Sequence, residues 1–233
     1  MEHERIRKAW SGETPCRWCG IKDLVLFADL AESDFDLIHL PIAEQRFAAG
    51  DVLYNAGEGG EALFTVRSGL VKLVQVLPDG TQRIVRLLGQ GATAGLEILV
   101  GAPYEHTAVA LQSTFVCRLP REVVERLDRE TPHLHRRLME RWHAALSQAD
   151  QWLTRLSTGS ARQRVARLAL ALMDERGVLM LFSREDVGAM VGLTTETASR
   201  AVAEFRRRGL LRDLGENRYE GDRAALEALA DGG

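Results

Sequence analysis

The chain has 233 residues, a formal net charge of −3 and 45% hydrophobic residues. This length accommodates two modest domains, each with an apolar core. No stretch approaches the roughly 18 consecutive apolar residues of a membrane span, and the best candidate, "LALALM" at 168–173, is far shorter. Because the charged N-terminus "MEHERIRKAW" lacks an apolar signal core, we expect a cytoplasmic protein with no membrane partner.

The charge is unevenly distributed. Residues 155–212 contain eleven Arg and no Lys against six Asp and Glu, which gives +5 and leaves −8 for the remainder. A basic segment on an otherwise acidic protein is typical of a nucleic-acid-binding module. A solvated, arginine-rich helix face is the alternative.

Residues 31–120 carry closely spaced turn signals between short apolar runs. The run "LVKLVQVL" at 70–77 is followed by Pro78, Asp79 and Gly80, and "TQRIVRLL" then returns as the second strand of a hairpin. Many short strands with glycine-rich corners favour a small antiparallel β-roll or barrel. The segment 1–30, which precedes it, contains two of the three cysteines.

After Pro120 the pattern becomes helical. A heptad seam with spacings of 4, 3, 4, 3 and 4 predicts a long dimerisation helix over 121–158. Its members are Leu138, Trp142, Ala145, Ala149, Trp152 and Leu156. A second apolar stripe, Met139, Leu146 and Leu153, repeats every seven residues. The alternative is a helix buried within one subunit. The sequence "STGS" at 157–160 reads as a linker, so we place a domain boundary there.

Residues 159–233 have the pattern of a winged helix-turn-helix. Ser183, with Asp186 three residues later, predicts the start of one helix, and Gly192 allows a tight turn. Thr194 or Thr195 then caps a second helix that runs to about Arg208. "LLRDLGENRYEG" beyond it predicts a hairpin wing around a central Gly-Glu-Asn turn.

The second helix has one packing face and one polar face. Ala198, Val202 and Phe205 share the first, whereas Glu196, Ser199, Arg200 and Arg207 share the second. Glu can accept from a cytosine amine, Arg can bind guanine O6 and N7 together, and Ser is short enough to meet a base. We therefore predict a DNA-binding set near the start of the helix. The set is Thr194, Thr195, Glu196, Ser199 and Arg200. A simple i, i+4 ion pair between Glu196 and Arg200 is the alternative.

A β-roll, a long dimer helix and a winged helix-turn-helix carrying "ETASR" together resemble the CRP/FNR family of bacterial transcription regulators over essentially the whole chain. The glycine pattern of "AAGDVLYNAGEGGEALFTVRSGLVKL" is similar to that family's roll. The resemblance implies an α+β fold, a homodimer on palindromic double-stranded DNA, and action through RNA polymerase. Glu196, Ser199 and Arg200 resemble the FNR branch, which implies a half-site like TTGAT.

The same resemblance argues against cyclic AMP as the effector. Family members that bind a cyclic nucleotide carry a Gly-Glu pair and a downstream Arg-Ser or Arg-Thr that neutralises the phosphate. In this chain Leu96 interrupts the Gly-Glu pair, and His106-Thr107 stands where Arg-Ser would fall. A cyclic-nucleotide or other small-molecule-responsive module remains the rival interpretation.

The three cysteines raise the question of a metal site. FNR-type oxygen sensors hold an iron–sulfur cluster with four cysteines. Cys16, Cys19 and Cys117 resemble three of them, but the fourth position falls at Val25, which cannot ligate iron. Asp23, water or an external thiol could complete such a site. The resemblance implies a redox, oxygen or nitric oxide sensor, and a haem sensor also stays open.

Other roles for the cysteines remain open at this stage. They include zinc binding, thiol exchange and, for Cys117, a core position on the strand face of Phe115 and Leu119. A thiol-disulfide enzyme is disfavoured because "CRWC" lacks a βαβ setting. With no catalytic constellation in view, we predict that the protein is not an enzyme.

Overall fold

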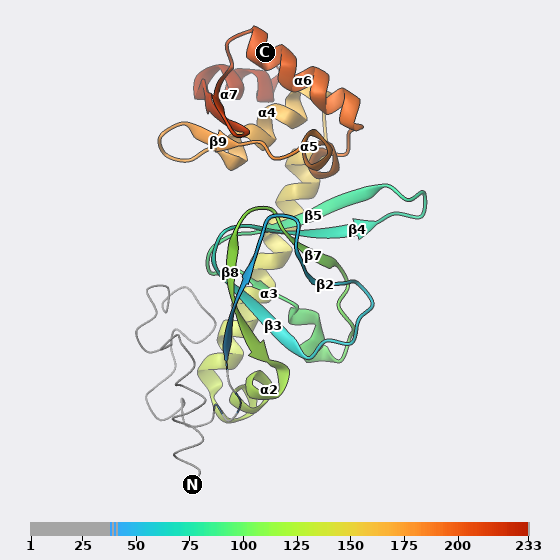
Figure 1. The fold of residues 1–233 in the computed structure, drawn as a ribbon, viewed down its shortest axis with the longest axis vertical. Coiled ribbons are helices and arrows are strands. Elements are labelled where there is room, and N and C mark those ends of the chain that lie inside the picture. The colour runs from blue at the N-terminus through green and yellow to red at the C-terminus, as the bar shows by residue number, and fades with distance from the viewer. Residues whose placement is uncertain (1–37, 39, 41, 233) are drawn as a thin grey trace. The chain divides into compact units, whose positions relative to one another are not determined.

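The computed structural model describes residues 38, 40 and 42–232 (Figure 1). The predicted segment 1–30, with Cys16, Cys19, Asp23 and Val25, lies outside the described residues. The described chain forms two compact units. The first takes in the described part of 1–75 together with 86–146, and the second takes in 76–85 and the described part of 147–233.

Strands β1 to β8 form two four-stranded sheets, as the turn-rich pattern predicted. One has the strand order β1-β8-β3-β6 and the other β2-β7-β4-β5. The β1–β8, β8–β3, β3–β6, β2–β7 and β7–β4 pairs are antiparallel. The strands are β1 Ala43–Phe47, β2 Val52–Tyr54, β3 Ala62–Ser68, β4 Val71–Val76, β5 Gln82–Leu88, β6 Thr93–Ala94, β7 Thr107–Ala110 and β8 Thr114–Pro120. The predicted antiparallel β-roll is confirmed.

The predicted hairpin at residues 78–80 is present between β4 and β5. Gly80 has a φ of +83°, a conformation that glycine adopts without steric cost. Its N–H donates to the Leu77 carbonyl at 2.9 Å. The Asp79 carboxylate accepts from the Thr81 N–H at 2.9 Å, as expected for an Asp in a tight turn.

The single helix predicted over 121–158 is divided in the structure. Helix α2, Arg121–Glu130, ends at Thr131, and helix α3 runs over Pro132–Gln151. Thr131 has extended backbone angles, φ −128° and ψ 101°. The break follows from Pro132, because a proline disfavours the helical conformation of the residue before it. A π-helical turn, η5 at Trp152–Leu156, follows α3.

The second unit contains a winged helix-turn-helix, as predicted. Its helices are α4 Ala161–Leu172, α5 Arg184–Val191, α6 Thr195–Arg207 and α7 Arg223–Asp231. Its three strands, β9 Val178–Met180, β10 Leu211–Gly215 and β11 Arg218–Gly221, form a sheet in the order β10-β11-β9. Glu216 and Asn217 both have positive φ, 51° and 59°, which matches the turn type that suits a two-residue hairpin.

Buried side chains from α4, α5, α6 and α7 form the core of this unit. Leu168, Met190, Phe205 and Leu226 are all fully buried. None of the helices in the described part of the chain is long and apolar enough to cross a membrane.

Candidate nucleic-acid interface

Helix α5 begins and ends where the sequence indicated. The Ser183 hydroxyl accepts from the Asp186 N–H at 3.0 Å and donates to the Asp186 carboxylate at 2.7 Å. Gly192 ends the helix in the left-handed region, at φ +66°. Gly188 is a residue that the sequence analysis missed. A Cβ atom there would lie 2.6 Å from the Leu193 carbonyl oxygen, so the turn requires glycine at this position too.

Thr194, and not Thr195, caps the recognition helix α6. The Thr194 hydroxyl accepts from the Thr197 N–H at 3.2 Å and donates to the Thr197 hydroxyl at 2.9 Å. The cap satisfies one of the unpaired N–H groups at the start of the helix. It also fixes the orientation of Thr195 and Glu196, which occupy the first turn.

The two faces of α6 differ as the sequence predicted. Ala198, Val202 and Phe205 are fully buried in the core of the unit, and Ala201 is buried beside them. On the opposite face Thr195, Glu196, Ser199 and Arg200 are exposed. The structure therefore brings the five predicted DNA-binding residues together at one end of a single helix, with their side chains exposed to solvent.

An ion pair joins two of these residues. An Arg200 guanidinium nitrogen lies 3.7 Å from a Glu196 carboxylate oxygen, and the two side chains are 70% and 79% exposed. An exposed pair of this kind contributes only a few tenths of a kcal/mol. A bidentate contact between arginine and guanine contributes about 1–3 kcal/mol of discrimination. The ion pair is therefore too weak to prevent either side chain from contacting a base.

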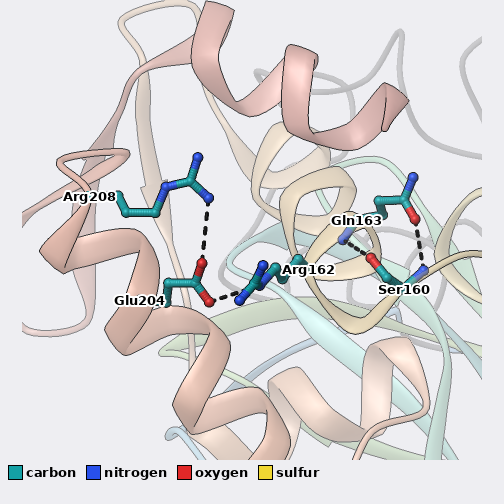
Figure 2. A network of polar contacts seen from close by, with 5 residues as sticks. All are labelled: Ser160, Arg162, Gln163, Glu204 and Arg208. Carbon is teal, nitrogen blue, oxygen red and sulfur yellow. Dashed lines mark hydrogen bonds and ion pairs between the residues drawn. The ribbon is translucent and has the colours of Figure 1, made fainter. Parts of the chain in front are cut away.

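Other arginines of the basic segment are bound within the unit. Figure 2 shows Glu204 of α6 between two of them, Arg162 of α4 at 2.9 Å and Arg208 at 3.4 Å. In the same view the Ser160 hydroxyl accepts from the Gln163 N–H at 3.3 Å and the Gln163 side chain accepts from the Ser160 N–H at 2.8 Å. Both arginine side chains stay more than half exposed, at 58% and 51%, so the pairing lowers the number of unpaired arginines and not the number that face solvent.

The apolar stripes along α3 and η5 differ from the sequence prediction in one respect. Leu138 and Leu156, at the two ends of the predicted seam, are buried within the chain, whereas Trp142 and Ala145 are half-buried and Ala149 is exposed. The second stripe is the exposed one, because Met139, Leu146 and Leu153 are 49%, 62% and 66% exposed. This stripe, with its spacing of seven residues, is the apolar surface that the helix presents.

Trp152 also departs from the predicted seam. Its indole N–H donates to the Met190 carbonyl of α5 at 2.9 Å, so the ring packs within its own chain. Trp152 thus belongs to the DNA-binding unit instead of the surface stripe.

Cys117 lies on the central strand β8 of one sheet and is half-buried. Its register partners are Glu44 on β1 and Thr65 on β3. Among the described residues no group of three or more His, Cys, Asp and Glu side chains could hold a metal ion. Cys117 is the one predicted ligand that the structure describes, since Cys16 and Cys19 precede residue 38.

The segment that follows β6 contains a buried glutamate and a half-buried histidine. Glu97, in the 3₁₀ turn η4 at Leu96–Val100, is buried, and its carboxylate accepts from the Glu105 N–H at 3.2 Å. Burial, followed by the nearby Arg86 guanidinium, lowers the pKa of His106 below its ordinary value of 6.5. This shift disfavours the protonated imidazole, so His106 is a weaker source of positive charge than the arginine of the family pattern.

Comparisons with known proteins agree with this geometry. Residues 44–130 match the family model of the cyclic nucleotide-binding domain, and residues 163–229 match that of the Crp-like helix-turn-helix domain. The fumarate and nitrate reduction regulatory protein of Salmonella typhi is 27% identical over 240 residues, which cover 98% of this chain and 96% of that protein.

Two solved structures show the same fold. FixK2 from Bradyrhizobium japonicum is 27% identical with a TM-score of 0.72, covering 82% of this chain and 98% of that one. A CRP-family transcriptional regulator from Thermus thermophilus is 30% identical with a TM-score of 0.70, covering 80% and 96%. The exposed, capped helix α6 and these similarities lead to one conclusion: the chain belongs to the CRP/FNR family and is a DNA-binding transcription regulator.

Proposed function

We propose that this regulator reads a palindromic double-stranded DNA site, with half-sites like TTGAT, through Thr194, Thr195, Glu196, Ser199 and Arg200. The observation that carries the proposal is the arrangement of α6. Its apolar face is buried, its N-terminus is capped by Thr194, and its polar side chains are exposed at the end where recognition helices meet base edges. Bound in this way, the protein acts on transcription through RNA polymerase.

The proposed regulator is a homodimer whose subunits meet along the exposed stripe Met139, Leu146 and Leu153. Burial of this stripe against the same stripe of a second subunit removes apolar surface from water. A spacing of seven residues keeps the stripe on one side of the helix, so two copies can pack along its length. A two-fold dimer places two recognition helices in successive major grooves, so the half-sites lie about one helical turn apart.

Charge placed in the stripe tests the dimer and the reading mode together. Leu146→Glu buries an unpaired carboxylate between subunits, so we expect a monomer in sedimentation and at least about a hundredfold weaker binding to the palindrome. Gln151→Glu, an exposed position at the end of α3, is the matched control. An intact Leu146→Glu dimer, or equal affinity of the native chain for one half-site and for the palindrome, would contradict the proposal.

The proposed signal is oxygen, redox state or nitric oxide, detected by a site that includes Cys16, Cys19 and Cys117. Similarity over nearly the full length to the fumarate and nitrate reduction regulatory protein supports this branch of the family. Three cysteines cannot supply the four thiolates that usually hold an iron–sulfur cluster. An iron–sulfur site in this chain therefore needs a ligand of another kind.

We accordingly divide the chain into a cysteine segment at 1–30, a sensor roll at 31–120, a dimerisation segment at 121–158 and a DNA-binding domain at 159–233. The absorbance spectrum and the iron and sulfide content of protein purified without oxygen test whether the cysteine segment holds an iron–sulfur site. Cys117→Ser should remove the iron, the sulfide and oxygen-dependent DNA binding together. Cys117→Ser protein with an unchanged spectrum would place Cys117 in the core and leave zinc or thiol exchange for Cys16 and Cys19.

We further propose that cyclic AMP is not the effector. Leu96 and His106, whose pKa is lowered, support this, since leucine carries no charge and the imidazole is a weaker source of positive charge than arginine. A ligand present at about 100 times its dissociation constant stabilises the folded state by about 2.7 kcal/mol. Thermal unfolding of the whole chain with millimolar cyclic AMP should show no such rise in midpoint, and a clear rise would restore the cyclic-nucleotide interpretation.

A further inference from the structure

The C-terminal end of helix α5 is held by side chains from two other segments. The last carbonyls of any helix lack partners within it. Here the Trp152 indole N–H of η5 donates to the Met190 carbonyl at 2.9 Å. The Arg164 guanidinium of α4 donates to the carbonyls of Val191 and Gly192, at 2.8 and 3.2 Å. Three successive carbonyls at the turn of the helix-turn-helix are thus bound from outside it.

The segment that follows Trp152 is bound to the same unit. Arg167 of α4 donates to the carbonyls of Arg155 at 3.1 Å and Thr158 at 2.8 Å. Two other nitrogens of the same guanidinium donate to the Ala230 carbonyl near the end of α7, at 3.1 and 2.8 Å. The sequence "STGS" at 157–160 reads as a linker, but the chain on both sides of it is attached to α4, α5 and α7.

Trp152 is close in sequence to α3 and close in space to the recognition helix. Met190 and the cap residue Thr194 are separated by three residues, the last residue of α5 and the two residues of the tight turn. The backbone packs closely within this turn, because a Cβ at Gly188 would lie 2.6 Å from the Leu193 carbonyl oxygen. A displacement of the Met190 carbonyl therefore moves the first turn of α6 with it. The π-helical geometry of η5 is rare and occurs frequently at functional sites.

We infer that Trp152 is a positioning residue that couples the end of helix α3 to the recognition helix, through its hydrogen bond to the Met190 carbonyl. Trp152 then moves together with the helix-turn-helix. A shift at the end of α3 therefore reaches α6 through Trp152 and does not depend on the 157–160 segment. This inference rests on the proposed reading function of α6. It adds a residue outside the helix-turn-helix to those that set the spacing of half-sites the dimer accepts.

Trp152→Phe in the full-length protein separates the hydrogen bond from the bulk of the ring. We expect amide hydrogen exchange to rise by about tenfold in residues 190–197, the factor that corresponds to the removal of one hydrogen bond, with α7 unchanged. The preference for the best palindrome over sites with one base pair more or less between the half-sites should fall several-fold. Trp142→Phe, the same change ten residues earlier, is the matched control.

A second pair of variants tests the same turn from α4. Arg164→Met should raise exchange in 190–197 as Trp152→Phe does, and Arg164→Lys, which keeps a donor, should restore much of the protection. Trp152→Phe protein that matches Trp142→Phe in both exchange and spacing preference overturns the inference. Exchange that rises equally in α7 also overturns it, because Trp152 would then be an ordinary stability residue.

The proposed function is tested separately, by measuring the DNA binding of the unsubstituted protein. Failure of that chain to prefer a palindrome over random DNA removes the proposed reading mode. The exchange comparison between Trp152→Phe and Trp142→Phe still decides whether the indole holds the turn.

Discussion

Helices α4 and α6 lie in the same unit and both carry several arginines, but they use them in opposite ways. On α4, Arg162 is paired with Glu204, and Arg164 and Arg167 donate to backbone carbonyls. On α6, Arg200 extends from an exposed face, with Glu196 at 3.7 Å. The same residue type therefore binds backbone carbonyls on one helix and has an exposed guanidinium on the other.

The difference follows from what faces each helix. The C-terminal ends of α5 and α7 approach α4, and their unpaired carbonyls accept from its guanidinium groups. The outer face of α6 carries polar residues and faces solvent, so the Arg200 guanidinium stays exposed, as the proposed base reading requires. Net charge along a sequence cannot separate these two uses, because both contribute equally to it.

The largest effect on stability should come from replacing an arginine of α4 that binds backbone carbonyls. Arg167→Met removes a guanidinium that donates to three carbonyls, and hydrogen bonds of charged groups contribute about 1.5–3 kcal/mol each, although not additively. We expect the free energy of unfolding to fall by about 3 kcal/mol in urea denaturation followed by circular dichroism. Arg207→Met, an exposed position on α6, should change it by less than about 0.5 kcal/mol. Equal changes in the two variants would mean that α4 does not use its arginines structurally.

Replacement of the exposed Arg200 on α6 should instead change DNA binding and leave stability nearly unchanged. Arg200→Ala should weaken binding to the palindrome by about 1–3 kcal/mol per half-site and relax the preference at one base pair, because the bidentate contact with guanine can no longer form. The free energy of unfolding should stay within about 0.5 kcal/mol of the native value. Binding titrations on the palindrome and on base-substituted sites measure this. An equal decrease of affinity for random DNA would show that Arg200 contacts phosphate.

The same contrast explains which features were predictable from the sequence. The caps, the turn and both faces of α6 fall within residues 183–208, and local patterns of hydrogen bonding and periodicity determine them. Ser183, Gly192 and Phe205 could therefore be assigned without a structure. The bonds of Arg164 and Trp152 join residues 27 to 38 positions apart, and no local pattern indicates them.

Two errors on the predicted long helix have simple physical causes. The stripes through Leu138 and through Leu146 have the same spacing of seven residues, so periodicity alone cannot say that the first is buried at its ends while the second is exposed throughout. Pro132 was compatible with the first turn of a helix, yet it ended the preceding one at Thr131. The cysteine site depends on residues about a hundred positions apart, so it remains a prediction.

A smaller effect should separate reading from phosphate contact on α6 itself. Arg207 is exposed near the C-terminal end of the helix, away from the proposed base-reading residues. If it meets a phosphate, Arg207→Ala should weaken binding to specific and random DNA to a similar extent. The slope of log affinity against log salt should become shallower by about 1 for each phosphate that the variant no longer neutralises. An unchanged slope would leave Arg207 without a role in DNA binding.

The smallest effect lies in the roll, where a basic side chain is buried instead of exposed. His106 has a lowered pKa, first through burial and then through Arg86, with Glu97 and Glu105 acting in the opposite direction. Its folded-state pKa lies below the unfolded value of about 6.5, so the unfolded state binds more protons once the pH falls below that value. We therefore expect the free energy of unfolding to decrease as the pH falls from about 6.5 toward the folded-state pKa. Above about pH 6.5 this histidine should not change the free energy of unfolding.

His106→Gln removes that titration while keeping a polar side chain of similar size. Urea denaturation between pH 7.5 and pH 5.5 should show a flatter dependence of the free energy of unfolding on pH in this variant than in the native protein. His143→Gln, at an exposed position on α3, controls for the replacement of a histidine by glutamine. A native-like slope in His106→Gln would mean that burial in the roll does not penalise the charged imidazole, and the contrast between buried and exposed basic groups would then be confined to the DNA-binding unit.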